Sequence, residues 1–188
     1  SAMIQRDFNL ECVNLATSGQ ARMDFYIAEA MASIEDAICY VIDPVPNCTK
    51  DRCDTATYDF INILRTLRPE VPIVMVEGLM YPYTRHDSYH AEYLPQKNEC
   101  FRRGFDQHVA ENPKGMYYMT HEGQTGPDME GTVDGVHLTD YGFRAYADLL
   151  EIVVKEALDD TDVDYDVEPA YNVVRKKTFW QRLMDLFQ

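Results

Sequence analysis

Short apolar runs alternate with helical patterns along most of this chain, and no other feature constrains the fold as strongly. Four runs, at residues 12–15, 38–42, 73–76 and 116–119, hold four or five mostly apolar residues each. Continuous runs of this length, rich in valine, isoleucine and tyrosine, are typical of strands buried on both faces. The runs therefore predict a sheet with cover on both sides.

Helical spacing of apolar residues fills the intervals between these runs. It predicts helices over 25–34, 57–67, 92–110 and 139–158, the last with Thr139 as its N-cap. Because strands and helices alternate, we expect an α/β fold with a parallel sheet and helices on both faces.

Composition and charge exclude several classes of protein. The 188 residues, 46% of them hydrophobic, suit one self-supporting domain. The net charge of −15 argues against a nucleic-acid partner. No run approaches the roughly 20 apolar residues of a transmembrane segment. No secretory signal opens the chain, and residues 1–3 resemble a cloning remnant, so we favour the cytoplasm and leave secretion open if a signal was removed.

The five cysteines do not make a closed disulfide framework, because their number is odd. Cys12 and Cys39 lie in apolar runs and are expected to be buried thiols. Cys48 and Cys53 are close enough in sequence for a bridge, but this spacing is weak evidence. We favour a reduced protein.

The composition changes after Leu158. Six of the ten residues in 159–168 are acidic, which is typical of a solvated linker or tail. Residues 178–188 are amphipathic and would suit docking on their own domain, an oligomer or partner interface, or a membrane surface. We therefore expect a domain over 1–158 and a tail over 159–188, with docking of the tail on its own domain favoured and a homo-oligomer contact through it as an alternative.

One segment, VDGVHLTDYG at 133–142, carries the clearest chemistry. Asp134 and His137 lie three residues apart, just before a predicted helix. A histidine held by a carboxylate is a general base for a nucleophile. The spacing alone is also typical of helix caps and surface hydrogen bonds.

Four blocks together resemble the SGNH hydrolases, also called GDSL-like lipases and acylhydrolases. They are NLATSGQARM at 14–23, DPVPN at 43–47, RTLRPEVPIVMVE at 65–77 and VDGVHLTDYG at 133–142, in family order across residues 3–155. The resemblance implies a flavodoxin-like three-layer α/β/α fold with a parallel sheet. It also implies an ester substrate and no cofactor or metal.

The resemblance assigns roles by position. His137 matches the catalytic base, Asp134 the acid that orients it, Gly19 a backbone donor to the oxyanion and Asn47 the side-chain donor. One oxyanion donor is typically worth about 3–4 kcal/mol of transition-state stabilisation. The chain departs from the family pattern at five positions that remove no catalytic group: Ala16, Thr17, Gln20, Ala21 and Leu138.

The nucleophile is the serious departure. The family's serine block ends a first strand that this chain does not contain, so that strand is missing or replaced. None of the four serines, Ser1, Ser18, Ser33 and Ser88, lies in a strand–turn–helix context that would expose a nucleophile. The run AYNVV at 170–174 is a strand candidate that could fill the empty position.

Residues 81–93 are a second region of interest. By resemblance Tyr81, Tyr83 and His86 belong to a substrate-contacting loop, although exposed loop tyrosines need no function. His86 and His90 would share a metal only if they lay on a helix, and we expect a loop there.

The resemblance thus implies a carboxylic-ester hydrolase with a Ser-His-Asp mechanism whose serine is not in this chain, with a carbohydrate O-acetyl ester as a candidate substrate. The alternative is a catalytically inactive SGNH-like domain that binds a ligand or assembles with partners.

Overall fold

A computed structural model describes residues 1–161 of the chain. Its contacts divide the chain into two compact units, 13–164 and 1–12 with 165–188. The described part of the second unit holds helix α1 (Ala2–Phe8), which ends at Asn9 in a left-handed conformation. The predicted strand at 170–174 and helix at 178–188 lie outside the described residues, and the boundary at Leu158 stays a prediction.

The larger unit is built on a parallel three-stranded sheet. Strands β1 (Tyr40–Ile42), β2 (Ile73–Val76) and β3 (Met116–Met119) lie side by side in chain order. The register places Ile42 opposite Met75 and Val76 opposite Met119. The described residues therefore confirm three of the four predicted strands and the parallel α/β class.

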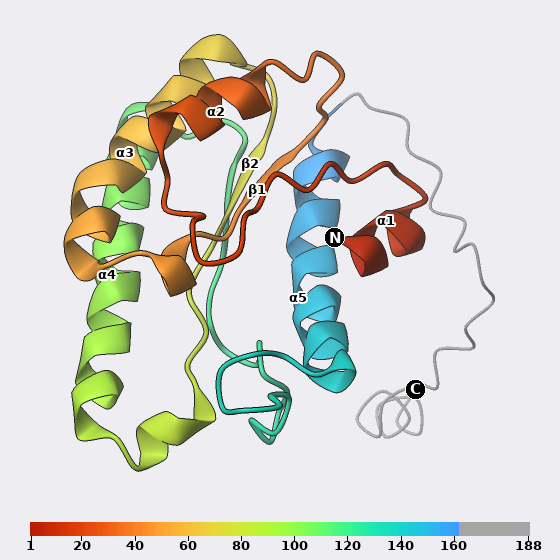
Figure 1. Cartoon of the computed structure of the whole chain (residues 1–188). Helices are drawn as coiled ribbons and strands as arrows, with labels where there is room; N and C mark the ends of the chain where they lie inside the picture. The colour runs from red at the N-terminus through yellow and green to blue at the C-terminus, as the bar shows by residue number, and fades with distance from the viewer. Residues whose placement is uncertain (162–188) are drawn as a thin grey trace, which may run out of the picture. The chain divides into compact units, whose positions relative to one another are not determined.

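Helices cover both faces of this sheet (Figure 1). Helices α2 (Phe25–Ala32), α3 (Lys50–Leu67) and α4 (Ser88–Glu111) lie on one side, and α5 (Asp140–Asp159) packs against β2 and β3 on the other. Two short 3-10 helices, η1 (Val45–Asn47) and η2 (Pro82–Arg85), follow β1 and β2. The result is the three-layer arrangement that the sequence predicts.

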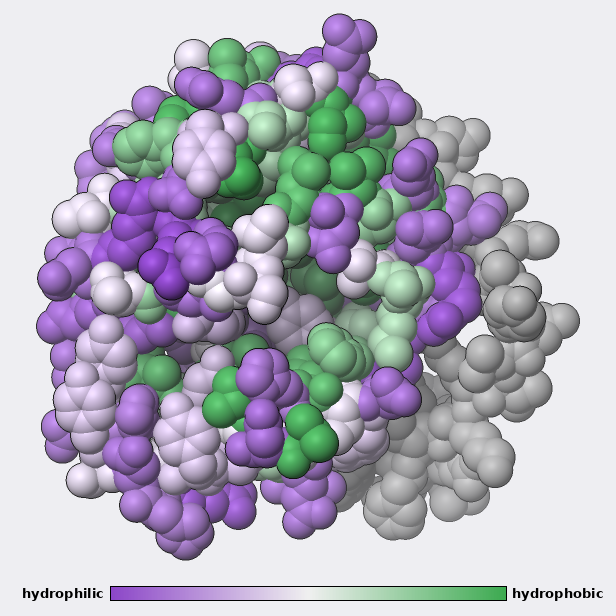
Figure 2. Space-filling view, viewed as in Figure 1, coloured by the Kyte–Doolittle hydropathy of each residue, from purple (hydrophilic) through white to green (hydrophobic). Residues whose placement is uncertain are grey.

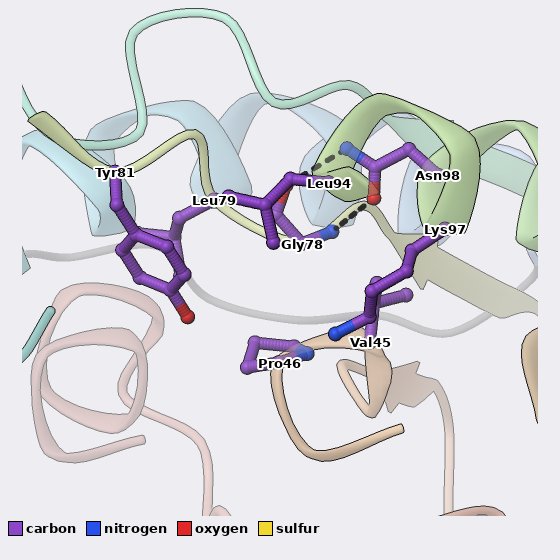
Figure 3. A pocket seen from close by; sticks show the side chains of 8 residues that line it. All are labelled: Val45, Pro46, Gly78, Leu79, Tyr81, Leu94, Lys97 and Asn98. Carbon is purple, nitrogen blue, oxygen red and sulfur yellow. Dashed lines mark hydrogen bonds between the residues drawn. The ribbon is translucent and has the colours of Figure 1, made fainter. Parts of the chain in front are cut away.

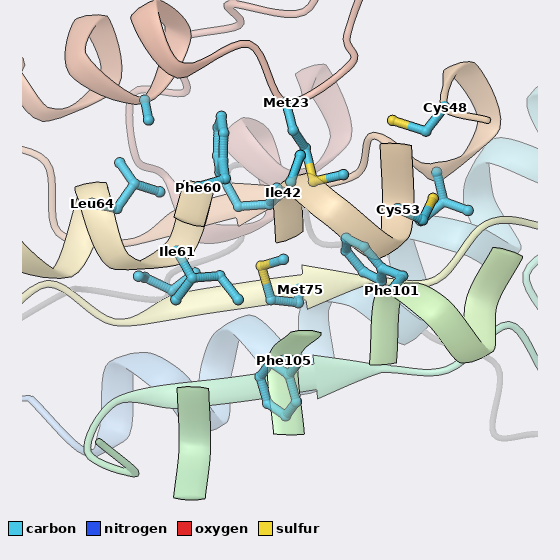
Figure 4. Close-up of a cluster of buried hydrophobic side chains, with 14 of the residues drawn as sticks. Met23, Ile42, Cys48, Cys53, Phe60, Ile61, Leu64, Met75, Phe101 and Phe105 are labelled. Atoms are coloured by element: carbon cyan, nitrogen blue, oxygen red, sulfur yellow. The ribbon is translucent and has the colours of Figure 1, made fainter. Parts of the chain in front are cut away.

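The main hydrophobic core lies between the sheet and the three-helix layer (Figure 4). Ile73 and Met75 of β2 belong to this core, packed with side chains such as Phe60 and Phe101. Val74 and Val76, which alternate with them, are also completely buried. Alternate residues of a strand face opposite sides of the sheet, so β2 is buried on both faces. This explains its uninterrupted apolar run.

The predicted strand at 12–15 is wrong. These residues adopt no regular structure, and Val13 and Leu15 are 53% and 38% exposed. Among the described residues β1 pairs only with β2, so no neighbouring strand supplies hydrogen bonds to this run. The side chain of Asn14 instead accepts a hydrogen bond from the N–H of Ala16 at 2.9 Å, a local turn that competes with strand pairing.

Two helices begin earlier than predicted. Helix α3 starts at Lys50, where Thr49 caps the N–H of Arg52, and α4 starts at Ser88, where Asp87 caps the N–H of His90. The loop expected around residue 90 is therefore helical. Helix α5 and its N-cap Thr139 are confirmed, because the Thr139 hydroxyl accepts from the N–H of Gly142 at 3.2 Å.

The cysteines differ in part from expectation. All five are free thiols, so Cys48 and Cys53 form no bridge here. Cys12 and Cys39 are only partly buried, whereas Cys48, Cys53 and Cys100 are buried. The prediction that Cys12 and Cys39 are buried was wrong, because both residues lie outside the paired strands.

Hydrophobic residues lie among hydrophilic ones on the face of the described surface that Figure 2 shows. No helix among the described residues has the length and apolar character needed to cross a membrane.

Candidate active site

Asp134 and His137 form a hydrogen-bonded pair in the larger unit. Nδ1 of His137 lies 2.7 Å from Oδ2 of Asp134, and the N–H groups of His137 and Val136 donate to Oδ1 at 2.8 and 2.9 Å. These three hydrogen bonds hold the pKa of Asp134 well below its usual value. Because Nδ1 is engaged, Nε2 of His137 is free, and 79% of the His137 side chain is exposed.

Backbone contacts fix the loop that carries this pair. Thr132 and Leu138 form an isolated β-bridge, and the N–H of Val133 donates to the carbonyl of His137 at 2.8 Å. The loop closes onto the first turn of α5, where Gly131 and Gly142 touch. A Cβ on Gly142 would lie only 2.0 Å from the Gly131 oxygen, so this approach requires glycine.

Asn47, the predicted oxyanion donor, ends η1 just beyond β1. Its backbone N–H donates to the carbonyl of Pro44 at 3.0 Å, which closes the turn. Its half-buried side chain has no hydrogen-bond partner among residues 1–161. The amide group is therefore available to donate to a ligand.

Gly19 lies in an exposed turn with a φ of 69°, a conformation that favours glycine. Arg22 donates to the carbonyl of Gly19 at 3.1 Å. Arg52, in the first turn of α3, donates to the carbonyls of Arg22 and Met23 at 2.8 and 2.6 Å. The Gly19 turn is thus tied to the start of the helix that follows Asn47.

Packing links the Asn47 turn to the His137 loop. Pro46 lines a small pocket together with Leu79 and Tyr81, which follow β2 (Figure 3). Leu138, next to His137, packs against the cluster that contains Leu79 and Tyr81. Both turns therefore lie at the carboxyl edge of the parallel sheet, where α/β proteins usually bind ligands.

Two of the three predicted substrate-loop residues lie beside this loop. Tyr81 and Tyr83 stack with ring centroids 5.5 Å apart, and a Cβ on Gly135 would lie 3.5 Å from Cδ1 of Tyr83. His86 is exposed, and its side chain contacts no polar group in the described part of the chain. Substrate contact by these three residues remains a prediction.

No serine hydroxyl in residues 1–161 hydrogen-bonds to His137. Ser18 lies in the Gly19 turn, and Ser88 begins α4. The Ser33 hydroxyl donates to the carbonyl of Ala30 at 2.7 Å. All four serines lie in the described residues. That this chain holds no nucleophilic serine stays a prediction, and activity measurements can test it.

The structure also holds a glutamate–histidine pair that the sequence did not predict. Oε2 of Glu77 lies 2.7 Å from Nδ1 of His121 and accepts the backbone N–H of His121 at 3.0 Å. Together with exposed Glu122 these residues offer three possible metal ligands within 4.8 Å of one another. The sequence signal for this pair is that Glu77 and His121 each follow one of two neighbouring strands. It was insufficient because His121 has no acidic partner at a helical or loop spacing that would point to Glu77.

The alternative site, in which His86 and His90 share a metal, is not assembled among the described residues. Nδ1 of His90 lies 2.6 Å from Oδ2 of Asp87, the residue that caps α4. The pair repeats the spacing of Asp134 and His137, and we assign it a capping role.

Comparisons with known proteins agree with this fold. A crystal structure of a protein from Bacteroides ovatus, described as a GDSL-like lipase, matches 84% of this chain and 47% of that one, with 28% identity and a TM-score of 0.79. A salicylyl acyltransferase from a tetracycline biosynthetic pathway matches 82% of this chain and 48% of its own, with 14% identity and a TM-score of 0.66, and shows the fold alone. The chain spans about half the length of both. No curated protein sequence matches it.

The parallel sheet with helices on both faces defines an α/β protein of the three-layer class, with the aspartate–histidine pair at the carboxyl edge of the sheet. The chain belongs to the GDSL-like lipase/acylhydrolase family, whose sequence model matches residues 1–155. This membership confirms the resemblance to the SGNH hydrolases and supports a hydrolase type of function.

Proposed function

We propose that this chain supplies the base and the oxyanion donors of a carboxylic-ester hydrolase. The observation that carries the proposal is the hydrogen bond of 2.7 Å between His137 and Asp134, which leaves an exposed Nε2 free to accept a proton. The attacking serine comes from residues outside this chain. A short acyl ester, with a carbohydrate O-acetyl group as the candidate, is the substrate.

In the first half of the reaction, the serine oxygen bonds to the ester carbonyl carbon while Nε2 of His137 takes the hydroxyl proton. Asp134 keeps the ring oriented and stabilises the imidazolium. The N–H of Gly19 and the amide of Asn47 donate to the oxyanion. The intermediate then collapses, the bond to the alcohol oxygen breaks, and His137 returns the proton to the departing alcohol.

In the second half, water attacks the acyl-serine carbonyl and His137 takes one proton from that water. The same two donors hold the second oxyanion. Collapse releases the carboxylic acid, and the proton on His137 passes back to the serine oxygen. The cycle needs no redox partner or cofactor.

A second candidate function, a catalytically inactive binding domain, is favoured by one observation. None of the four serines is hydrogen-bonded to His137 within residues 1–161. The unengaged amide of Asn47 and the free Nε2 of His137 favour the hydrolase instead, because an inactive site has no chemical need for both.

A fluorophosphonate probe with intact-mass measurement tests the choice. We expect no addition to this 188-residue chain and one addition to a longer form that carries the residues upstream in its gene. In the longer form, His137→Ala should slow labelling and hydrolysis of a nitrophenyl acetate by about 10³-fold or more. His90→Gln is the matched control, because its pair has the same local geometry, and it should keep the parent rate.

A folded longer form that neither reacts with the probe nor hydrolyses esters would overturn the hydrolase and favour the binding domain. Labelling of the 188-residue chain itself would contradict the proposed source of the serine, and peptide mapping would identify the residue. Comparison of acetyl and butyryl esters of one sugar would test the acyl preference.

A further inference from the structure

A small pocket separates η1 from α4 and the segment after β2. Its walls are mostly apolar and include Val45, Pro46, Leu79 and Leu94. The pocket is partly open to solvent, and the space inside it is about 10 Å³, room for one water-sized group. It adjoins the turn that ends at Asn47, but none of the steps proposed above uses it.

Two polar side chains reach into this pocket. Lys97 of α4 is 5% exposed and Tyr81 is 8% exposed. Figure 3 shows the amine of Lys97 and the hydroxyl of Tyr81 directed toward Pro46 from different sides. Among the described residues neither group has a hydrogen-bond or ion-pair partner, and both polar atoms keep contact with solvent at the mouth of the pocket.

The other polar residue of the wall is already satisfied. The side-chain amide of Asn98 accepts from the N–H of Gly78 and donates to the Gly78 carbonyl, both at 2.9 Å. These two bonds fix the backbone at Gly78 as one rigid wall. Lys97 and Tyr81 are therefore the groups left to recognise a ligand.

An ammonium held at a mostly apolar wall without a counter-charge is less well solvated than in water, so an anionic partner would lower its free energy. The ionisable groups that act on Lys97 are the thiols of Cys48 and Cys53, and burial lowers the pKa of Lys97. An ammonium can only donate hydrogen bonds, and the Tyr81 hydroxyl can add a second. The complementary ligand atom is an anionic oxygen.

We propose that this pocket binds the carboxylate of a small carboxylic acid, with one oxygen between Lys97 and Tyr81. The space admits one oxygen rather than the three of a phosphate, and the apolar walls suit a short alkyl group at the mouth. The carboxylate belongs either to a free acid or to the far end of an acyl chain. Binding requires no ester hydrolysis, so it stands or fails separately from the proposed function.

An NMR titration of the 188-residue chain tests the pocket through the amide signals of Gly78 and Leu79. Acetate should produce saturable shifts, and acetamide, its neutral isostere, should bind at least about tenfold more weakly. Monomethyl succinate carries its carboxylate at the end of an acyl chain. Tighter binding of this compound than of acetate points to the acyl chain as the source, and the reverse order points to a free acid.

The variants Lys97→Met and Tyr81→Phe keep the bulk of each side chain and remove its polar atom. We expect Lys97→Met to weaken acetate binding at least tenfold and Tyr81→Phe to weaken it severalfold. Lys114→Met is the matched control, because Lys114 lies on the surface with its side chain 79% exposed, and it should bind like the parent.

Lys97→Met should fold, since it removes an unpaired charge from a mostly apolar wall and keeps the bulk of the side chain, and circular dichroism checks this. If it does not fold, Tyr81→Phe decides the test. Equal binding of acetate and acetamide, unchanged binding in a folded Lys97→Met variant, or no saturable shift with either carboxylate would overturn the proposal.

Discussion

The carboxylate of Asp134 holds His137 at two points, the ring Nδ1 at 2.7 Å and the backbone N–H at 2.8 Å. The orientation of the ring is therefore set within four consecutive residues. The Glu77–His121 pair has the same double contact, but its members are 44 residues apart and depend on the pairing of β2 with β3.

Acid should loosen the Asp134 loop. Hydrogen bonds lower the pKa of Asp134 in the folded protein, so the folded state binds fewer protons than the unfolded state near the usual value of 3.8. The stabilisation is complete above that value and is lost as the pH falls through the folded pKa. Amide shifts of Val136 and His137 should report this loss, and Asp134→Asn should remove it.

Asp128→Asn is the control for that titration. The Asp128 carboxylate also accepts a nearby N–H, that of Glu130 at 3.0 Å, but holds no histidine. This variant should keep the parent response at Val136 and His137. The same acid response in Asp134→Asn would show that another group loosens the loop.

Arg52→Ala should release the Gly19 turn. The Arg52 guanidinium donates to the carbonyls of Arg22 and Met23 and to the carboxylate of Asp24. Losing charge-assisted hydrogen bonds to a turn should lower the free energy of unfolding by about 1–3 kcal/mol. Hydrogen exchange should increase over residues 18–24.

Lys114→Ala serves as the comparison for Arg52→Ala. Lys114 forms one exposed ion pair with Glu70, and such pairs contribute roughly 0–1 kcal/mol. Exchange over residues 18–24 should not change in this variant. Equal effects of the two substitutions would show that Arg52 does not hold the turn.

The sequence was most informative where the structure depends on neighbouring residues. The apolar runs of β2 and β3 and the Thr139 cap of α5 were predicted because apolar strands and N-caps leave direct sequence patterns, although only β2 is buried throughout and β3 is mostly half-buried. The starts of α3 and α4 were missed. Their first turns, which follow Thr49 and Asp87, are mostly polar and show no apolar period.

Relations between distant residues could not be predicted in the same way. Asp134 and His137 were paired from their spacing, whereas Glu77 and His121 could be paired only once the register set Val76 opposite Met119. The run at 12–15 was mistaken for a strand because its apolar composition does not show whether a partner strand exists. The roles of Gly19 and Asn47 rest on resemblance and await activity measurements.

Gly142→Ala should disrupt the loop of the proposed base. The added methyl group would lie 2.0 Å from the Gly131 oxygen, and neither backbone can move without shifting the bridge at Thr132 and Leu138. We expect a loss of about 1–3 kcal/mol or more in the free energy of unfolding, measured by urea denaturation.

Gly123→Ala separates backbone strain from this steric clash. Gly123 has a φ of 78°, but its added Cβ would meet only the Leu149 side chain at an ordinary 3.5 Å. A loss of about 1–2 kcal/mol from the left-handed conformation is expected, with unchanged amide signals at Val136 and His137. If Gly142→Ala also leaves those signals unchanged, the contact with Gly131 does not position the loop.

Buried His108 should make the protein sensitive to mild acid. It is 2% exposed, and neither ring nitrogen has a hydrogen-bond partner among the described residues. Burial, with a smaller contribution from the charge of Arg65, lowers its pKa, while Glu111 opposes the shift. The unfolded state therefore binds a proton first as the pH falls, so the free energy of unfolding decreases below about pH 6.5 until the folded pKa is reached.

His108→Phe keeps an aromatic ring beside Tyr58, whose ring centroid lies 5.8 Å from that of His108, and removes the titrating group. Urea unfolding between pH 5 and 8 should give a flatter pH profile for this variant than for the parent. His86→Asn, which replaces a histidine at an exposed position, is the control and should leave the parent profile unchanged. A parent profile that is already flat, or one that His108→Phe does not flatten, would show that the buried ring does not control the response to acid.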